Sequence, residues 1–290
     1  MKLRINYHGS RGSSTISILA VLAIFMIALA IGWYINKDKV AKQPQYQLKL
    51  EMIALSPKQP KWIKTDVLTK VFADQKLEDQ YLTDRKLATQ LRDAFLLHSC
   101  VAGVTKVSKR PDGVDVQLVY RHPVAMVVVK LDNGTFLYPV DEQAVVLPPG
   151  QFHSEDIVKY LRVNHDFVPP AGQIGDSWGD DKIVKAAKVA ALLGQAPWQK
   201  MGLYSLELVE NSETKETVVY VLKKDANGFR ILWGSLPGQE SENEVGAPDK
   251  LRRLVEFYEN NKTLEVSTEP MELDLRPLKK IEVVPLVEVE

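Results

Sequence analysis

The sequence predicts an α+β protein with an N-terminal transmembrane helix, a small β-α-α-β-β module, and a mostly antiparallel β domain with flanking helices. One apolar run near the N-terminus has the length of a membrane-spanning helix. Two amphipathic helical patterns then precede two alternating strands, and further strand patterns joined by glycine-containing turns fill the remainder. The expected segments are a short cytoplasmic stretch (1–15), a transmembrane helix (16–35), a tether (36–45), the β-α-α-β-β module (46–123), the β domain (124–276) and a C-terminal strand and tail (277–290).

Residues 16–35 (ISILAVLAIFMIALAIGWYI) are apolar almost throughout. Twenty helical residues at about 1.5 Å each extend about 30 Å, which matches the hydrocarbon core of a bilayer. Trp33 and Tyr34 end the run, where amphipathic rings favour the membrane interface. A cleaved signal peptide is the alternative, but its apolar region is normally about 7–15 residues long and ends at a small-residue cleavage site. The charged sequence 36–39 follows here, so we expect an uncleaved anchor.

Lysines and arginines flank this run on both sides, so the positive-inside rule gives only a weak asymmetry. Long domains cross a membrane largely regardless of their charge, whereas a short N-terminal segment stays in the cytoplasm more readily. We therefore expect a cytoplasmic N-terminus, with residues 37–290 on the outer face.

The first soluble module has the order β-α-α-β-β. Thr65 is the expected N-terminal cap of its first helix, because a threonine hydroxyl can accept a hydrogen bond from a free backbone N–H. Cys100, the single cysteine, follows the second helix and is expected to be a small buried hydrophobe. The expected elements are strand 46–55, helix 65–74, helix 84–99, strand 104–109 and strand 114–121.

The second module is rich in strands. Asp132-Asn133-Gly134 lies between two of them and predicts a hairpin, because Asn-Gly readily adopts positive φ. The polar segment 238–246 has the composition of a linker but is too short to divide domains. The expected strands are 124–131, 135–139, 144–147, 203–210, 217–223, 229–233, 271–276 and 281–289, and the expected helices are 181–193 and 247–258.

Composition and motifs favour binding over catalysis. The 37 basic residues balance 37 acidic ones, so no net positive charge favours nucleic acid. Neither a GxxxxGK[ST] nor a GxGxxG phosphate loop occurs. His153, Glu155, Asp156 and His165 form a cluster whose spacing matches no metal site, so solvated loop and helix-start residues are the preferred interpretation. We expect no enzymatic activity, no cofactor, no metal and no small-molecule substrate.

Three patches in this order resemble the bacterial cell-division proteins FtsQ and DivIB. The first is a strand pair that ends in Arg121-His122-Pro123-Val124-Ala125, close to the family's "E-R-x-P-V-A". The second is Leu137-Tyr138-Pro139-Val140-Asp141-Glu142, followed by Leu147-Pro148. The third combines Ile231-Leu232-Trp233-Gly234, Lys250-Leu251-Arg252-Arg253-Leu254 and Leu273-Asp274-Leu275-Arg276.

This resemblance implies a scaffold rather than an enzyme. The β-α-α-β-β module would be a POTRA domain, and the chain would lie in the bacterial cytoplasmic membrane at the division septum. Its partners would be small single-pass division proteins of the FtsB and FtsL kind. Family members add a partner strand at their C-terminal sheet edge, a mode that suits unpaired backbone groups. The matching positions are Asp274, Leu275, Arg276, Ile281, Val283 and Val284.

Other interpretations remain open. Leu275, Ile281 and Val283 are equally suited to a hydrophobic core, and Pro277 would shorten a pairing surface that began before it. A second hypothesis is a membrane-anchored POTRA-type assembly or translocation factor that binds extended polypeptides of many sequences. A third, an anchored hydrolase, needs a nucleophile or a metal set, such as His153 and His165 within about 5 Å of each other.

Overall fold

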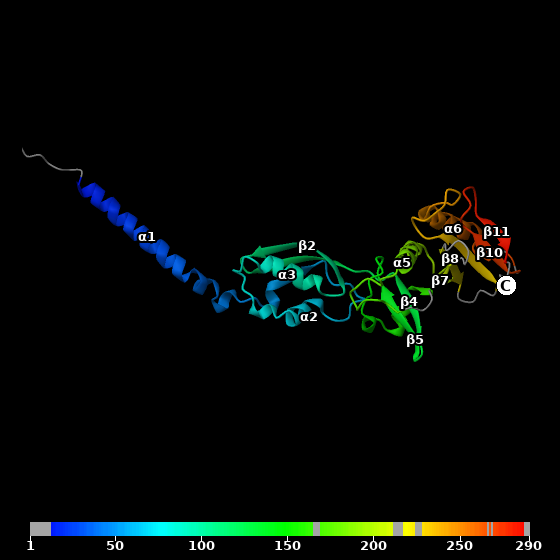
Figure 1. Ribbon diagram of the computed structural model, residues 1–290, viewed down its shortest axis with the longest axis horizontal. Helices are drawn as coiled ribbons and strands as arrows, with labels where there is room; N and C mark the ends of the chain where they lie inside the picture. Colours follow the sequence, from blue (N-terminus) through cyan, green and yellow to red (C-terminus); the bar gives the residue numbers. More distant parts are fainter. Residues whose placement is uncertain are drawn as a thin grey trace, which may run out of the picture.

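The computed structural model describes residues 13–164, 169–210, 217–223, 228–265, 267 and 269–286. The described chain is elongated, with a long helix at one end, a small module in the middle and a larger β domain at the other end (Figure 1). The predicted fold class is confirmed: an apolar N-terminal helix, a small mixed sheet with helices, and a larger, mostly antiparallel sheet with helices.

Helix α1 (Ser13–Ala41) contains the segment Ile18–Lys37, which has a mean hydropathy of 2.6 and is long enough to cross a membrane. None of this segment is buried against the rest of the described chain. An apolar helix without any protein contact requires another apolar environment, because exposed hydrocarbon is unfavourable in water. A membrane anchor and a signal sequence both have this character.

The first module is a three-stranded sheet in the order β1-β3-β2, with β1 parallel and β2 antiparallel to β3. Its helices cover one side of the sheet and enclose a hydrophobic core that includes Leu91, Phe95 and Val116. The elements are β1 (Ile53–Ser56), α2 (Val67–Asp74), α3 (Leu87–Leu96), β2 (Val101–Arg110) and β3 (Gly113–Tyr120).

Two details of this module differ from the expectation. Two short 3-10 helices, Pro44–Tyr46 and Leu50–Met52, overlap the predicted strand 46–55, and only its last residues join the sheet, as β1. Leu48 in this segment is buried, and its N–H donates to the carbonyl of Gln80 at 2.9 Å.

The cap of α2 is Asp66 rather than Thr65. The Asp66 carboxylate accepts a hydrogen bond from the N–H of Thr69 at 2.6 Å. The Thr65 hydroxyl is used elsewhere, because it accepts from the amide of Gln151 at 3.0 Å. A charged carboxylate at a helix N-terminus also interacts favourably with the helix dipole, which explains the preference.

The second module contains an eight-stranded sheet in the order β11-β10-β9-β8-β7-β6-β4-β5. Three of its strand pairs are parallel, namely β10 with β9, β4 with β6 and β6 with β7. The strands are β4 (Ala125–Leu131), β5 (Gly134–Val140), β6 (Leu161–Asn164), β7 (Leu203–Glu210), β8 (Thr217–Lys223), β9 (Phe229–Ser235), β10 (Met271–Asp274) and β11 (Glu282–Pro285). The helices are α4 (Ser154–Ile157), α5 (Asp181–Leu193) and α6 (Ala247–Asn261).

Helices α5 and α6 pack on one face of this sheet and form its main core. Val221, Ile231 and Leu273 lie side by side on the adjacent strands β8, β9 and β10 of that face and are all fully buried. The opposite face carries polar side chains, among which Arg230 lies over the ring of Tyr220 at 4.4 Å. The sheet therefore has one apolar face under the helices and an opposite face that is more polar but still buries Met126, Val128 and Leu232.

One prediction for this domain was wrong, and one strand was missed. Residues 144–147 do not form a regular strand, because they make only isolated bridges, Val145 with Ser177 and Val146 with Val140. Strand β6 was not predicted, although it lies between β4 and β7 in the sheet. Its four residues are too few for their alternation to stand out from the surrounding loops.

The two modules are joined by direct contacts. Arg121, just after β3, donates to the Asp141 carboxylate at 2.6 Å, and Asp141 is almost fully buried. Gln151 accepts hydrogen bonds from the N–H groups of Lys64 and Thr65. The ring of Trp62 stacks on Phe152, with 5.5 Å between their centroids. These contacts hold the middle of the chain against the C-terminal domain.

Replacing Asp141 with alanine is expected to loosen this joint and to lower the free energy of unfolding by about 2 kcal/mol, because a charged hydrogen bond is lost in a buried place. The Asp141 carboxylate also accepts from the N–H groups of Gln143 and Val145, at 3.0 and 2.9 Å. Hydrogen exchange should therefore become faster at these two amides. Asp132→Ala, in the exposed hairpin turn, is the control, and equal exchange in both variants would contradict the prediction.

Candidate functional site

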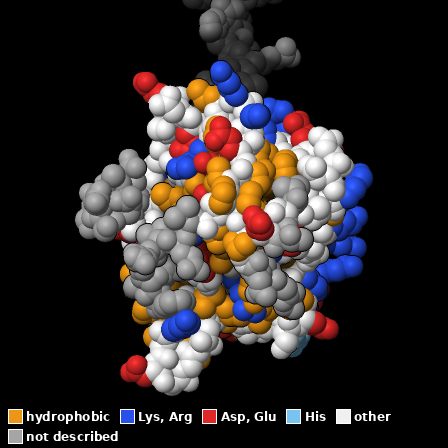
Figure 2. Space-filling model, turned by 90° about the vertical axis from the view of Figure 1, so that its right-hand side faces the viewer, with side chains coloured by type: hydrophobic (Ala, Val, Ile, Leu, Met, Phe, Trp, Pro, Cys, Tyr) orange, Lys and Arg blue, Asp and Glu red, His pale blue; other side chains and the backbone are white. Residues whose placement is uncertain are grey.

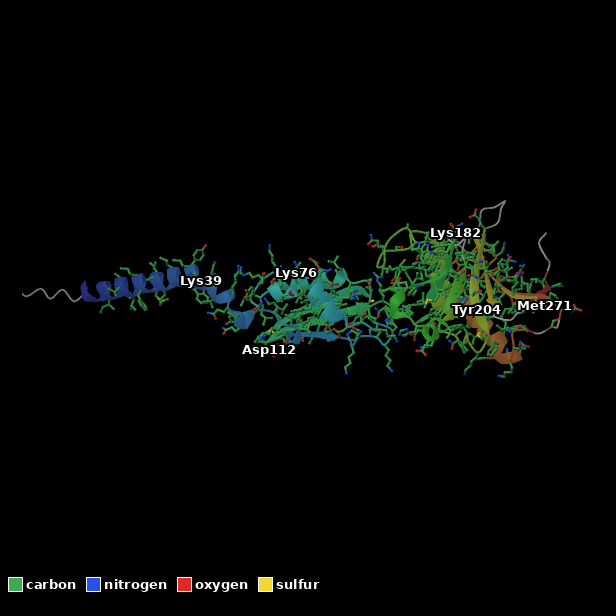
Figure 3. All side chains as sticks on the ribbon, turned by 90° about the horizontal axis from the view of Figure 1, so that it is seen from below. Lys39, Lys76, Asp112, Lys182, Tyr204 and Met271 are labelled. Carbon is green, nitrogen blue, oxygen red and sulfur yellow. The ribbon has the colours of Figure 1, made fainter. Side chains whose placement is uncertain are left out.

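Strand β11 is the edge of the large sheet and pairs only with β10 among the described residues. Among the described residues, β11 is the last strand of the second module, and its other side pairs with no strand. This strand lies at the end of the molecule opposite to α1 (Figure 1). Met271, which begins the neighbouring β10, lies at that same end, far from Lys39 of α1 (Figure 3).

The backbone groups on the open side of β11 can be assigned from one hydrogen bond. The N–H of Leu286 donates to the carbonyl of Pro270 at 3.0 Å. Residues of an antiparallel strand point alternately toward and away from the neighbouring strand, so Val284 turns its backbone groups toward β10. Val283 turns its N–H and C=O outward. Pro285 also points outward but has no N–H, so it can only accept.

The side chains of this edge divide between the two faces. Ile281 and Val283 are partly buried and pack against the core under α6. Val284 lies on the opposite face, next to Glu272 of β10. Glu272 in turn forms an ion pair with Arg230 at 2.5 Å. An added strand would therefore extend an apolar row on one face and a charged row on the other.

Asp274, Leu275 and Arg276 lie beside this edge rather than on it. Asp274 ends β10, which already has neighbours on both sides. Its carboxylate accepts from the backbone N–H of Arg276 at 2.9 Å and from the Arg276 guanidinium at 2.7 Å. Leu275 is fully buried, and its N–H donates to Leu232. The structure gives these residues a part in turning the chain toward β11, and their contact with a partner remains a prediction.

The end of the molecule that carries β10 and β11 exposes apolar side chains among charged ones (Figure 2). Leu278, in the loop that joins these strands, is 52% exposed. Lys279 and Lys280 follow it and are exposed as well. An edge strand with charges and a proline close by is protected against nonspecific pairing while still offering a short segment for a specific one.

A buried ion pair lies beneath this region and was not expected from the sequence. Lys250 of α6 is completely buried, and its Nζ lies 2.5 Å from Oε1 of Glu244. The same carboxylate accepts from the N–H and the hydroxyl of Ser235, at 2.8 and 2.6 Å. Gly234 leaves room for this group, because a Cβ there would lie 2.2 Å from Oε1 of Glu244. The linker-like segment 238–246 is therefore anchored inside the domain.

Lowering the pH should reduce the stability of the C-terminal domain, because Glu244 becomes protonated. Burial alone would raise the pKa of this carboxyl, but the hydrogen bonds from Lys250 and Ser235 outweigh burial and leave the pKa below its ordinary value of 4.5. A lowered pKa in the folded state contributes stability above about pH 4.5, and this contribution is lost as the pH falls through the folded value.

We expect the unfolding midpoint in urea to fall between pH 6 and pH 3 by more in the wild-type chain than in Glu244→Gln, which cannot titrate at this position. Equal pH dependence of the two proteins would show that Glu244 is not responsible. Measurements at constant ionic strength keep screening of the surface charges the same.

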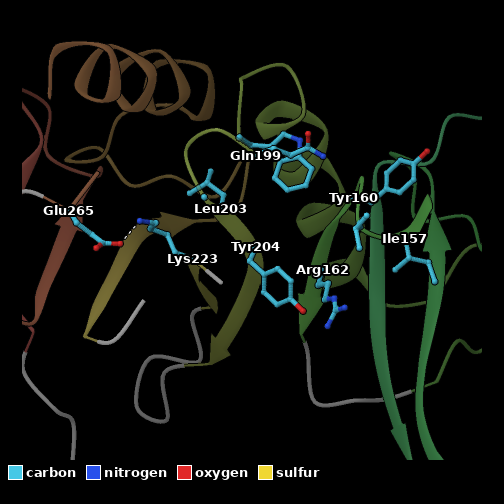
Figure 4. A pocket seen from close by; sticks show the side chains of 11 residues that line it. Ile157, Tyr160, Arg162, Gln199, Leu203, Tyr204, Lys223 and Glu265 are labelled. Atoms are coloured by element: carbon cyan, nitrogen blue, oxygen red, sulfur yellow. Dashed lines mark hydrogen bonds and ion pairs between the residues drawn. The ribbon is translucent and has the colours of Figure 1, made fainter. Parts of the chain in front are cut away.

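The large sheet also borders a cavity of about 620 Å³, close to the first residues of β6 and β7 (Figure 4). Its lining includes Tyr160, Trp198 and Tyr204, and the guanidinium of Arg162 lies over the ring of Tyr204 at 4.7 Å. Lys223 and Glu265 form an ion pair at its other side (Figure 4). The described lining contains no serine, cysteine or histidine that could act as a nucleophile or base.

The acidic and histidine cluster is placed only in part, because His165 lies outside the described residues. Asp156 accepts from the backbone N–H of His153 at 3.2 Å at the start of α4. The Lys159 ammonium and this N–H lower the pKa of Asp156 to about 2. Asp156 is thus engaged as an ion-pair and capping group. Within the described ranges, no three His, Cys, Asp or Glu side chains are arranged to hold a metal ion.

Cys100 is buried in the core of the first module, as expected. Burial raises the pKa of its thiol to about 11, so the reactive thiolate is scarce at neutral pH. This side chain acts as a packing residue.

No protein-family model matches the chain. A search of curated proteins likewise finds no match. The geometry of the β11 edge and the sequence patches around it are therefore the basis for assigning a function.

Proposed function

We propose that this chain is a membrane-anchored, non-enzymatic scaffold of the FtsQ and DivIB type, which docks other single-pass division proteins by strand addition at β11. The observation that carries the proposal is the open C-terminal edge, where Val283 offers an outward N–H and C=O on a strand that pairs only with β10 among the described residues. FtsB- and FtsL-like proteins are the proposed partners.

The position of the matching sequence patches supports this assignment. Arg121 from the first patch and Asp141 from the second are far apart in sequence but form the buried ion pair between the modules. In the third patch, Leu273 of β10 pairs with Ile231 of β9, and α6 carries the buried Lys250. Residues of the three matching patches thus contact one another where the two modules meet and beside the open edge of the sheet.

The N-terminal helix fits the same role. We propose that α1 is an uncleaved anchor in the bacterial cytoplasmic membrane, with the N-terminus in the cytoplasm and both modules outside it. An anchored protein and an anchored partner share a thin layer of space, so weak contacts become effective through high local concentration.

The location of a fluorescent fusion of the full-length chain tests the proposal. A ring at mid-cell in dividing bacteria is the expected result, and uniform staining of the membrane would argue against a division scaffold. Uniform staining together with capture of many unrelated extended peptides would favour the anchored assembly factor instead.

Capture of an FtsB-like partner from detergent extracts tests the surface. Ile281→Lys and Val283→Lys place a charge in the apolar row of the edge and should reduce capture at least tenfold. Lys279→Ala, in the exposed loop before β11, is the matched control and should leave capture within about twofold of wild type. Unchanged capture by both lysine variants would remove β11 as the docking edge.

A further inference from the structure

Three consecutive carbonyl groups in the loop after β10 are bound by donors from α6 or the segment just before it. The N–H of Val245 donates to the carbonyl of Arg276 at 3.0 Å. The guanidinium of Arg253 donates to the carbonyl of Pro277 at 2.6 Å and to the carbonyl of Leu278 through its other terminal nitrogen. The loop is therefore held along its backbone, independently of its side chains.

Arg253 is well placed for this contact. It follows the buried Lys250 by three residues, so the two side chains lie on neighbouring parts of the same helix surface. A guanidinium presents several N–H groups in a fixed plane and can bind two carbonyls at once, whereas a lysine ammonium offers a single point of charge. Arg252, the adjacent residue, points elsewhere and pairs with Asp249 and Glu256 on the helix surface.

Strand β11 depends on the loop that precedes it. The strand has four residues, and its ladder contains four residue pairs with β10. Ladders this short are prone to local opening, since few hydrogen bonds oppose the gain in backbone entropy. A loop fixed at Pro277 and Leu278 limits the conformations available to the residues that follow and favours the paired state of β11.

We infer that Arg253 is the positioning residue of the β11 edge: by binding two carbonyls of the preceding loop, it keeps β11 paired with β10 and its outward backbone groups extended. This inference rests on the proposed function for the use of that edge. The effect of Arg253 on β11 is a property of the chain alone and can be measured without any partner.

Hydrogen exchange of the full-length chain in detergent micelles tests the inference. The variants are Arg253→Met, Arg253→Lys and, as a matched control on the same helix, Arg252→Met. In Arg253→Met, the amide of Val284 in β11 and that of Leu286, just after the strand, should exchange at least tenfold faster than in wild type. Arg253→Lys should show an intermediate increase, because one carbonyl can still be bound.

Two internal references separate positioning from general stability. The N–H of Leu275 donates to Leu232 on the other side of β10, and α6 has its own helical hydrogen bonds. Both should exchange at the wild-type rate in all three variants. Equal β11 exchange in Arg253→Met and Arg252→Met would overturn the inference, and so would an equal increase at β11, Leu275 and α6.

Partner capture separates this inference from the proposed function. Arg253→Met should reduce capture of the FtsB-like partner about tenfold, while Arg252→Met should not. If the wild-type chain captures no such partner, the proposed function fails, and the exchange result at β11 still decides the role of Arg253.

Discussion

Replacing Lys250 with methionine is expected to lower the free energy of unfolding of the C-terminal domain by about 3–5 kcal/mol, the usual cost of removing one partner from a buried ion pair. Methionine keeps most of the aliphatic volume, so the loss comes from the charge rather than from a cavity. The Glu244 carboxylate would stay buried with hydrogen bonds from Ser235 alone. Urea unfolding, followed by tryptophan fluorescence, measures the change.

The same experiment contains its own controls. Arg252→Met removes a charge from the same helix, but Arg252 is exposed, so the free energy of unfolding should change little. The double variant Lys250→Met with Glu244→Gln has no buried charge and should recover a substantial part of the loss. A loss in Lys250→Met no greater than in Arg252→Met would show that the buried pair is dispensable.

Replacing Val283 with proline is expected to reduce capture of the partner strand at least tenfold while leaving β11 in place. The N–H of Val283 points away from the sheet, so its removal breaks no bond to β10. Proline is tolerated on an edge strand when its missing N–H faces outward. An incoming strand would lose this donor and meet the ring instead. A tenfold change in affinity corresponds to about 1.4 kcal/mol.

Neighbouring substitutions make this prediction specific. Val283→Thr keeps both the N–H and the approximate shape, and it should capture the partner within about twofold of wild type. Val284→Pro removes an N–H that faces β10. It should therefore disrupt the pairing of β11 with β10 and also abolish partner capture. Undiminished capture by Val283→Pro would mean that the partner does not pair along this strand.

The sequence predicts some elements well because their signals are local. Helix α5 has the expected limits, since its apolar stripe is regular and Asp180 accepts from the N–H of Lys182 at its start. The hairpin of β4 and β5 forms at Asp132-Asn133 as predicted, although the positive φ occurs at the following Gly134 and not at Asn133. Neither feature depends on distant residues.

Other features depend on contacts between distant segments, and the sequence does not reveal them. The strand order of the large sheet places β6 between β4 and β7, and no periodicity in four residues indicates that position. The open edge was expected at the C-terminus, but the placement of Asp274 and Leu275 on the inner side of β11 follows only from the strand pairing.

One feature of the sequence does indicate that Lys250 is buried. Lys250 occurs between Ala247 and Leu254, with spacings of three and four residues, so a lysine lies within the apolar stripe of α6. A charged residue on such a stripe needs a buried partner. The polar composition of segment 238–246 suggested a linker instead, although that segment supplies the partner.

Because β11 lies far from α1, only partners with a sufficiently long extramembrane segment can reach it. The strands of the large sheet are stacked outward along the molecule, so that β11 lies at the end opposite to the helix that resembles an anchor (Figure 1). If α1 spans a membrane, a partner anchored in the same bilayer needs an extramembrane segment long enough to reach from the bilayer to β11 before its strand can pair there. A helical stalk rises about 5.4 Å per turn. Deleting whole turns from a partner's stalk should thus end its recruitment abruptly, even though the docking strand itself is unchanged.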